Sequence, residues 1–372
     1  MTVGGDTDFD VVLAGPVFFD IIFTGLPGSP PPGTETFAQG MGASPGGIAN
    51  LAVATRRLGL RTALATVIGG DAYGRWTWEL LSQEGVDLRY SRRLPDWHTS
   101  VTVSLIEDGD RAMVTHAHDD PVSSQELLAD GVSARAAILD LSGLATGTDT
   151  WWRRAARQGT RLFAGTGWDP SGAWDVSDLD PLADCHCFIV NAGEAMGYAR
   201  ADTPLEAARW LATRVPLAVV TCGPDGAVAV DAISGEEASV PAIAAEVLDA
   251  TGAGDVFTAA FVVATLQEWS LSRRLAFAAL AAGLAVQNFG GALGAPGWCD
   301  IADWWAVVGP DADEEIAARY GFLTELLRAA DLRSVRRADP TLRFAEDRSA
   351  ADLLPSITPG PRPTPDSTHD PR

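Results

Sequence analysis

The sequence contains no lysine, so all 27 of its basic residues are arginine. A phosphate-binding lysine of the P-loop type is therefore excluded. Acidic residues number 49, which gives a formal net charge of −22 at neutral pH. Nonspecific nucleic-acid binding depends on basic side chains that contact phosphates, so this charge balance argues against it. We expect small molecules, and no nucleic acid, as partners.

Long apolar runs are also missing. No run reaches the ~18–20 residues that cross a membrane, and no basic segment followed by an apolar stretch opens the chain. The sequence therefore predicts no membrane span and no signal peptide, as in a cytoplasmic protein.

Cysteine is scarce, with four residues at positions 185, 187, 222 and 299. Their spacing fits neither a disulfide framework nor a CxxC metal motif. A structural zinc site needs four suitably placed ligands, so we expect reduced, structural cysteines rather than a metal site. Within a strand, Cys185 and Cys187 would share one face and His186 would take the other.

The 47% apolar content supports a substantial core in one large α/β domain or two small ones. Short apolar runs at 137–141, 162–164, 188–190 and 217–221 alternate with helical segments. This alternation is typical of βαβ units and a parallel sheet, in which ligands gather at the carboxyl ends of the strands. Residues 99–107 and 111–116 form a predicted hairpin with Asp108 and Gly109 at its turn.

Residues 248–258 combine an apolar run, small residues and a helix start. The sequence at 249–255 is D-A-T-G-A-G-D, and an apolar helical segment follows Asp255. Backbone N–H groups at a helix N-terminus form an anion hole suited to phosphate. A carboxylate there is explained by a base that takes a proton from an attacking hydroxyl. The alternative is a Gly-rich turn in which Asp255 is a first-turn capping residue.

This stretch resembles the C-terminal signature of the ribokinase-like (PfkB-type) carbohydrate kinases, which usually read D-T-x-G-A-G-D, so Ala250 is a mild departure. Near the N-terminus, Gly46, Gly47 and Asn50 open a predicted amphipathic helix that a glycine closes. They resemble the family's second signature, whose glycines and asparagine bind sugar hydroxyls. Asp20 lies in an apolar segment after the first strand, where a polyhydroxy ligand would satisfy it. By itself it also fits a solvent-facing aspartate.

Two further blocks follow the family's chain order. Asn191 and Glu194 resemble its N-x-x-E motif near magnesium and phosphates, and residues 221–226 resemble its T-x-G-x-x-G turn beside the nucleotide. Each block alone also fits a helix cap or a turn. The ATP-binding residues that the resemblance implies are Asn191, Glu194, Thr221, Gly223, Gly226 and Thr251.

The resemblance implies a three-layer α/β/α fold with a mostly parallel central sheet and a small β-sheet lid from about 16–44 and 97–118. It implies transfer of the ATP γ-phosphoryl group to a hydroxyl of a small sugar. Asp255 would act as the base, and the amides of Gly252, Ala253 and Gly254 would form the anion hole. Asp20, Gly46, Gly47 and Asn50 would bind the sugar. Glu194 would organise Mg²⁺ through water, and Asp249 with Gly290 would form a candidate K⁺ site.

The predicted kinase domain covers residues 1–308. A helical extension follows at 309–349, with an amphipathic helix over 312–330, and the Pro-rich segment 350–372 is predicted to be disordered. The lid is a candidate homodimer contact. Two alternative functions stay open: a nucleoside kinase, and a non-catalytic sugar-sensing protein on the same fold.

Overall fold

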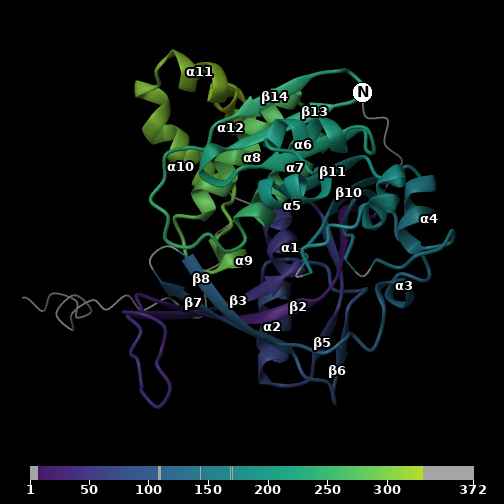
Figure 1. Cartoon of the computed structure of the whole chain (residues 1–372), viewed down its shortest axis with the longest axis vertical. Coiled ribbons are helices and arrows are strands. Elements are labelled where there is room, and N and C mark those ends of the chain that lie inside the picture. The colour runs from purple at the N-terminus through teal and green to yellow at the C-terminus, as the bar shows by residue number, and fades with distance from the viewer. Residues whose placement is uncertain (1–6, 108–109, 143, 168, 170, 330–372) are drawn as a thin grey trace, which may run out of the picture.

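The computed structural model describes residues 7–107, 110–142, 144–167, 169 and 171–329 (Figure 1). An eight-stranded sheet lies at its centre. Its strands, in spatial order, are β14 (Glu237–Val240), β13 (Ala227–Asp231), β12 (Leu217–Thr221), β11 (Cys187–Asn191), β10 (Arg161–Gly165), β9 (Ala134–Asp140), β1 (Phe9–Ala14) and β4 (Thr62–Ala65). The strands from β12 to β4 are parallel, and β13 and β14 are antiparallel.

Apolar residues on both faces of this sheet form two separate cores. Val11 and Leu13 of β1 enter one core, and Val12 between them enters the other. The first core is completed by α1 (Ile48–Arg57), α7 (Ala253–Leu266) and α8 (Leu271–Ala285), and the second by α4 (Trp151–Arg157), α5 (Ala192–Ala199) and α6 (Pro204–Leu211). Helices therefore cover both faces, which confirms the predicted three-layer α/β/α fold with a mostly parallel sheet.

A second, four-stranded sheet stands apart from the central one, at the lower left of Figure 1. Its order is β3 (Gly40–Gly47), β2 (Val17–Thr24), β7 (Ser100–Glu107) and β8 (Asp110–His116). These strands occupy the segments predicted for the lid, and the hairpin turn at 108–109 lies outside the described residues. Strands β5 (Val67–Gly69) and β6 (Arg92–Leu94) form a small third sheet.

The remaining helices surround these sheets. They are α2 (Ala72–Gln83), α3 (Ser124–Leu127), α9 (Gly291–Gly294), α10 (Trp298–Val308), α11 (Glu314–Tyr320) and α12 (Leu323–Ala329), with 3₁₀ turns η1 (Val176–Asp184), η2 (Gly223–Asp225) and η3 (Gly309–Asp311). None of the helices in the described part of the chain has the length and apolar character that a membrane span needs.

The predicted single helix over 312–330 is wrong, because Gly321 and Phe322 separate α11 from α12. Tyr320 at the end of α11 and Leu323 at the start of α12 both enter the first core. Residues 330–349 of the predicted extension and the predicted tail at 350–372 lie outside the described residues.

The expected arrangement of the cysteine pair is also wrong. Strand β11 begins at Cys187, so Cys185 lies before it and does not follow its alternation. Cys187 enters the first core and Cys185 the second. Burial raises the pKa of the Cys185 thiol to about 12, so this thiol stays protonated and structural at neutral pH. Within the described residues, no group of three or more potential ligands is placed to hold a metal ion.

Helix α1 is buried on nearly every side, with Arg56 as the exception among its ten residues. Its last residue, Arg57, is 1% exposed and donates to both carboxylate oxygens of Glu84, at 2.7 and 3.0 Å. The same guanidinium donates to the Leu293 and Ala295 carbonyls. The hydrogen bonds of the Arg57 guanidinium therefore connect α1 to the C-terminal end of α2 and to the residues around α9.

Arg57→Met is expected to destabilise the fold by about 3–5 kcal/mol, because it leaves Glu84 charged, buried and without its cation. Arg89→Met breaks the exposed pair between Arg89 and Asp87 and is expected to cost at most about 1 kcal/mol. Chemical denaturation of both variants measures the difference. Equal costs for the two variants would contradict the role given to Arg57.

Candidate active site

The N-terminus of α7 carries the glycine-rich stretch identified in the sequence. Helix α7 begins at Ala253, its N-cap is Gly252 with φ +76°, and Asp255 is the third helical residue. A side chain at position 252 would be strained by that φ, and its Cβ would lie 3.0 Å from the Gly291 Cα. The turn therefore requires glycine for two independent reasons.

Asp255 and Asn50 meet although 205 positions separate them in the sequence. The Asn50 side-chain amide donates to Asp255 Oδ2 at 2.9 Å, across the packed helices α1 and α7. The structure thus brings the two predicted signatures into direct contact. A first-turn carboxylate also suits the helix dipole, so the helix-start role and a role at a site are compatible for Asp255.

Asp20 and Gly46 are diagonal neighbours on the adjacent strands β2 and β3, where Asp20 pairs with Ser44 and Gly46 with Phe18. A Cβ placed on Gly46 would lie 2.0 Å from Asp20 Oδ2. The next residue, Gly47, has φ +61°, and a Cβ there would lie 2.6 Å from the Pro16 carbonyl. The glycine pair therefore leaves room for the Asp20 carboxylate and for the turn into α1.

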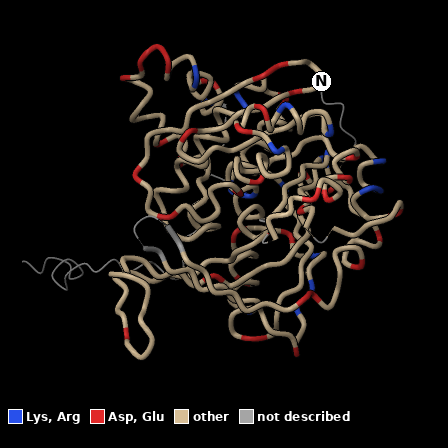
Figure 2. Tube along the Cα trace, viewed as in Figure 1, with Lys and Arg blue, Asp and Glu red and all other residues tan. Residues whose placement is uncertain are grey.

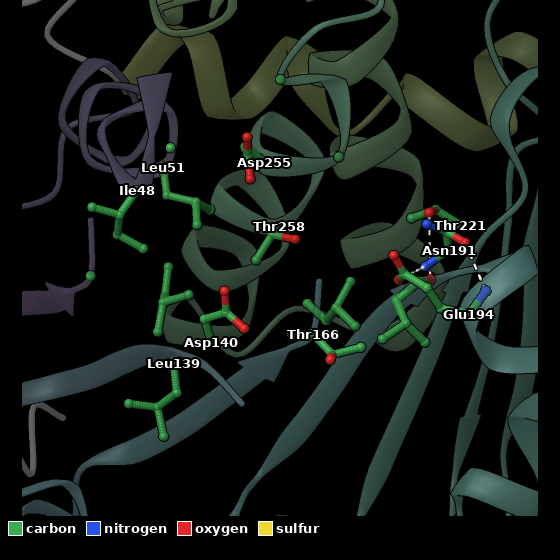
Figure 3. Close-up of a pocket in the computed structure, with 18 of the residues that line it drawn as sticks. Ile48, Leu51, Leu139, Asp140, Thr166, Asn191, Glu194, Thr221, Asp255 and Thr258 are labelled. Carbon is green, nitrogen blue, oxygen red and sulfur yellow. Dashed lines mark hydrogen bonds between the residues drawn. The ribbon is translucent and has the colours of Figure 1, made fainter. Parts of the chain in front are cut away.

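A cavity of about 580 Å³ opens between α7, α1 and the carboxyl ends of the central strands (Figure 3). Eight of the predicted site residues line it: Gly47, Asn191, Glu194, Thr221, Gly223, Gly252, Gly254 and Asp255. The other predicted residues are not among those that line it: Asp20, Gly46, Asn50, Gly226, Asp249, Thr251, Ala253 and Gly290. Among the three predicted anion-hole amides, that of Ala253 already donates to the Ala250 carbonyl at 3.3 Å.

Asn191 and Glu194 form a capping box at the start of α5. The Glu194 amide donates to Asn191 Oδ1 at 2.9 Å, and the Asn191 amide donates to Glu194 Oε2 at 3.1 Å. Burial raises the pKa of Glu194, and the nearby Asp140 carboxylate adds to the rise. A helix cap is enough to explain why Asn191 and Glu194 stand three residues apart. The same cap also holds the nearly buried Glu194 carboxylate at the cavity wall.

The glycine-rich turn after β12 is built by η2. Gly226 has φ +92°, and a Cβ there would lie 1.9 Å from the Val240 carbonyl, so only glycine fits. Thr221, at the end of β12, pairs with Asn191, at the end of β11. The two predicted nucleotide motifs therefore lie on neighbouring strands at the same edge of the sheet.

Asp249 and Gly290 are also adjacent. Asp249 is 3% exposed and accepts hydrogen bonds from the Thr251 amide at 2.8 Å and the Gly290 amide at 3.0 Å. The Gly290 carbonyl accepts from the Ser44 hydroxyl at 2.6 Å. This network joins the segment before α7 to the segments containing α9 and β3, and it supplies the oxygen ligands that a hard cation prefers.

The sequence analysis missed Asp140, Thr166 and Thr258, all of which line the cavity. Asp140 ends β9, and its side chain lies in the same space as Asp255 and Thr258 (Figure 3). Its surface is exposed to the cavity, yet the surrounding protein limits its hydration and raises its pKa. The sequence could have indicated Asp140 as a site residue, because it stands near the end of an apolar run that was predicted to be a parallel strand.

Gly46→Ala is expected to cost about 1–3 kcal/mol of stability, because the new methyl group overlaps the Asp20 carboxylate. In an Asp20→Ala background the same substitution should cost less stability. Chemical denaturation of the unsubstituted protein, the two single variants and the double variant measures this coupling. Gly167→Ala is the control, since its Cβ would lie at an ordinary 3.5 Å from Ser142 Oγ. Equal costs in both backgrounds would show that the two residues do not constrain each other.

Comparison with known sequences identifies relatives of this arrangement. Residues 25–297 match the family described as pfkB family carbohydrate kinase. A nucleoside kinase of Methanothermobacter thermautotrophicus is 28% identical over 292 residues, which cover 76% of this chain and 91% of that protein. A ribokinase of Haemophilus influenzae is 24% identical over 302 residues, which cover 78% of this chain and 93% of that protein.

Solved structures share the fold. Arabidopsis thaliana ribokinase, complexed with ribose and ATP, superposes with a TM-score of 0.65 at 23% identity and covers 79% of this chain and 98% of its own. Cryptococcus neoformans ribokinase, in complex with ADP, gives 0.64 at 23% identity, with 79% and 99% covered. The family match across most of the sequence, together with this fold, shows that the chain belongs to the PfkB family of carbohydrate kinases.

Proposed function

We propose that this protein is an ATP-dependent kinase that transfers the γ-phosphoryl group to a hydroxyl of a small carbohydrate. The observation that carries the proposal is the contact between Asp255 and Asn50 at the wall of the cavity. It joins a carboxylate at a helix N-terminus to the segment that the family uses for sugar recognition. The ribose and ATP named with the Arabidopsis ribokinase are consistent with this pairing of ligands.

Asp255 is the proposed general base, and it would accept the proton of the attacking hydroxyl. Phosphoryl transfer leaves little covalent chemistry to the protein, so positioning and electrostatic stabilisation supply most of the rate. The backbone around Gly252 and Gly254 lines the cavity beside Asp255 and would hold the transferred phosphate. Ala253 contributes through its place in the same turn, although its amide is partly engaged there.

The acceptor would bind on the side of the second sheet, through Asp20, Gly46, Gly47 and Asn50. The nucleotide would bind at the carboxyl ends of β11 and β12, through Asn191, Glu194, Thr221, Gly223 and Gly226, with Thr251 supporting the α7 turn. The nucleotide residues lie at the carboxyl edge of the parallel sheet, where ligands of α/β proteins bind, and the acceptor residues lie on the second sheet and in α1. The strands of the second sheet would act as the lid.

Glu194 fits the role of organising Mg²⁺, because its nearly buried carboxylate has a raised pKa that a cation would lower again. Mg²⁺ would neutralise charge on the phosphates. Since the described residues offer no cluster of three protein ligands, Glu194 would act largely through water, as is usual for this ion. Asp249 and the Gly290 carbonyl are the proposed ligands of an activating K⁺.

A nucleoside kinase is the second candidate, and the relative from Methanothermobacter thermautotrophicus favours it. A nucleoside presents a ribose hydroxyl to the same base, so turnover of adenosine beside hexoses and pentoses separates the two functions. A non-catalytic sugar sensor would bind ATP and sugar without transfer. The exposed strand β8 at the outer edge of the second sheet is the proposed contact of a homodimer.

Asp255→Asn is expected to lower turnover by roughly 10²–10⁴-fold, because the amide cannot accept the hydroxyl proton. Binding of the acceptor should survive, since Asn keeps the size of the side chain and an oxygen that accepts from Asn50. Steady-state kinetics and calorimetric titration measure the two effects separately. Turnover equal to that of the unsubstituted protein would remove Asp255 from the mechanism.

A further inference from the structure

The cavity is lined by three carboxylates, those of Asp140, Glu194 and Asp255. Among the described residues that line it, none is arginine or histidine, and the whole sequence contains no lysine. Acidic residues outnumber basic ones in the sequence, 49 to 27, and both kinds are spread along the described trace (Figure 2). Backbone amides and Mg²⁺ would meet the phosphates of the nucleotide, but the residues that line the cavity offer no basic side chain for a second anion.

Asp140 stands between the two halves of the cavity. The register of β9 against β1 pairs Ile138 with Leu13, so Asp140 lies level with Gly15, where the chain turns toward the second sheet. On its other side Asp140 pairs with Gly165 of β10, which has no side chain. The carboxylate therefore faces the space between the proposed acceptor residues and the proposed nucleotide residues.

The acceptor side is rich in hydrogen-bond acceptors. Asp20 lies over Gly46, and Asp140 and Asp255 line the cavity. Asn50 contacts Asp255 but is not among the residues that line the cavity, so Asp140 and Asp255 are the charged groups that an acceptor would meet on this side. Carboxylate oxygens accept hydrogen bonds, which hydroxyl and ammonium groups donate and carboxylate or phosphate groups do not.

We propose that the acceptor is a polyhydroxyl compound that carries no carboxylate or phosphate, either neutral or amino-bearing, and that Asp140 is the residue that excludes anionic acceptors. This inference rests on the proposed function and adds the charge class of its substrate. Like charges repel more strongly in a concave, partly dry site than in water, so one extra negative charge on the acceptor is strongly disfavoured.

Matched acceptor pairs test the proposal with ATP and Mg²⁺ at pH 8. Suitable pairs are glucose with gluconate, fructose with fructose 6-phosphate, and glucose with glucosamine. In each of the first two pairs we expect the neutral member to exceed the anionic one by at least about tenfold in kcat/KM, and glucosamine to equal or exceed glucose. An anionic member that equals or exceeds its neutral partner would overturn the inference.

Binding of the same compounds, measured by calorimetric titration, separates this inference from the proposed function. If acceptors bind but none is phosphorylated, the proposed kinase function fails, and the charge preference is still decided by the binding constants. Tighter binding of the neutral members supports the inference. Equal or tighter binding of the anionic members contradicts it whether or not transfer occurs.

Asp140→Asn tests the residue itself. Asparagine keeps an oxygen that can accept from the Ser142 amide, now at 2.8 Å, and removes only the charge. The ratio of kcat/KM for the neutral acceptor to kcat/KM for the anionic acceptor should fall by about tenfold, mainly because the anionic acceptor binds more tightly. Asp130→Asn is the control, because it removes the same charge at an exposed position away from the cavity and should leave the preference unchanged. An unaltered preference in Asp140→Asn would overturn the role of Asp140.

Discussion

The hydrogen bond between Asn50 and Asp255 is the contact on which the candidate site depends. It links the N-terminal turn of α7 to α1, and the close approach of Gly252 to Gly291 leaves little room for a side chain at position 252. Both helices are buried in the same core, so their relative position is set by packing over their full length. A packed core thus holds a carboxylate and a glycine-rich turn in one geometry, as the proposed phosphoryl transfer would require.

The electrostatics of the site follow from the same arrangement. The residues that line the cavity include no basic side chain, so the backbone at the start of α7 is its source of positive potential, and Mg²⁺ bound with a nucleotide would add to it. The carboxylates of Asp140 and Glu194 lie beside this region. The raised pKa of each shows that burial destabilises its charged form. Ionisable side chains with a perturbed pKa in a cavity are characteristic of functional sites, because a bound ligand can stabilise the charged form.

The sequence predicted the parallel strands and a helix beginning near Asp255, and it allowed a helix cap at Asn191 and Glu194, because each depends on local periodicity or on short turn chemistry. The meeting of Asn50 with Asp255 followed only from the family resemblance, since no local rule reports a contact over 205 residues. Asp140 was missed because its role depends on which strands neighbour β9. The break between α11 and α12 was missed because the apolar periodicity continues across Gly321, although glycine lowers helix propensity there.

The most direct measurement is a crystal structure with a non-hydrolysable ATP analogue and Mg²⁺. The account predicts that the γ-phosphate lies at the N-terminus of α7, within hydrogen-bond distance of the backbone at Gly252 to Gly254. It also predicts that the Asp255 carboxylate faces the space beside Asn50 and Asp20. A nucleotide bound elsewhere, with its terminal phosphate remote from Asp255, would contradict the account.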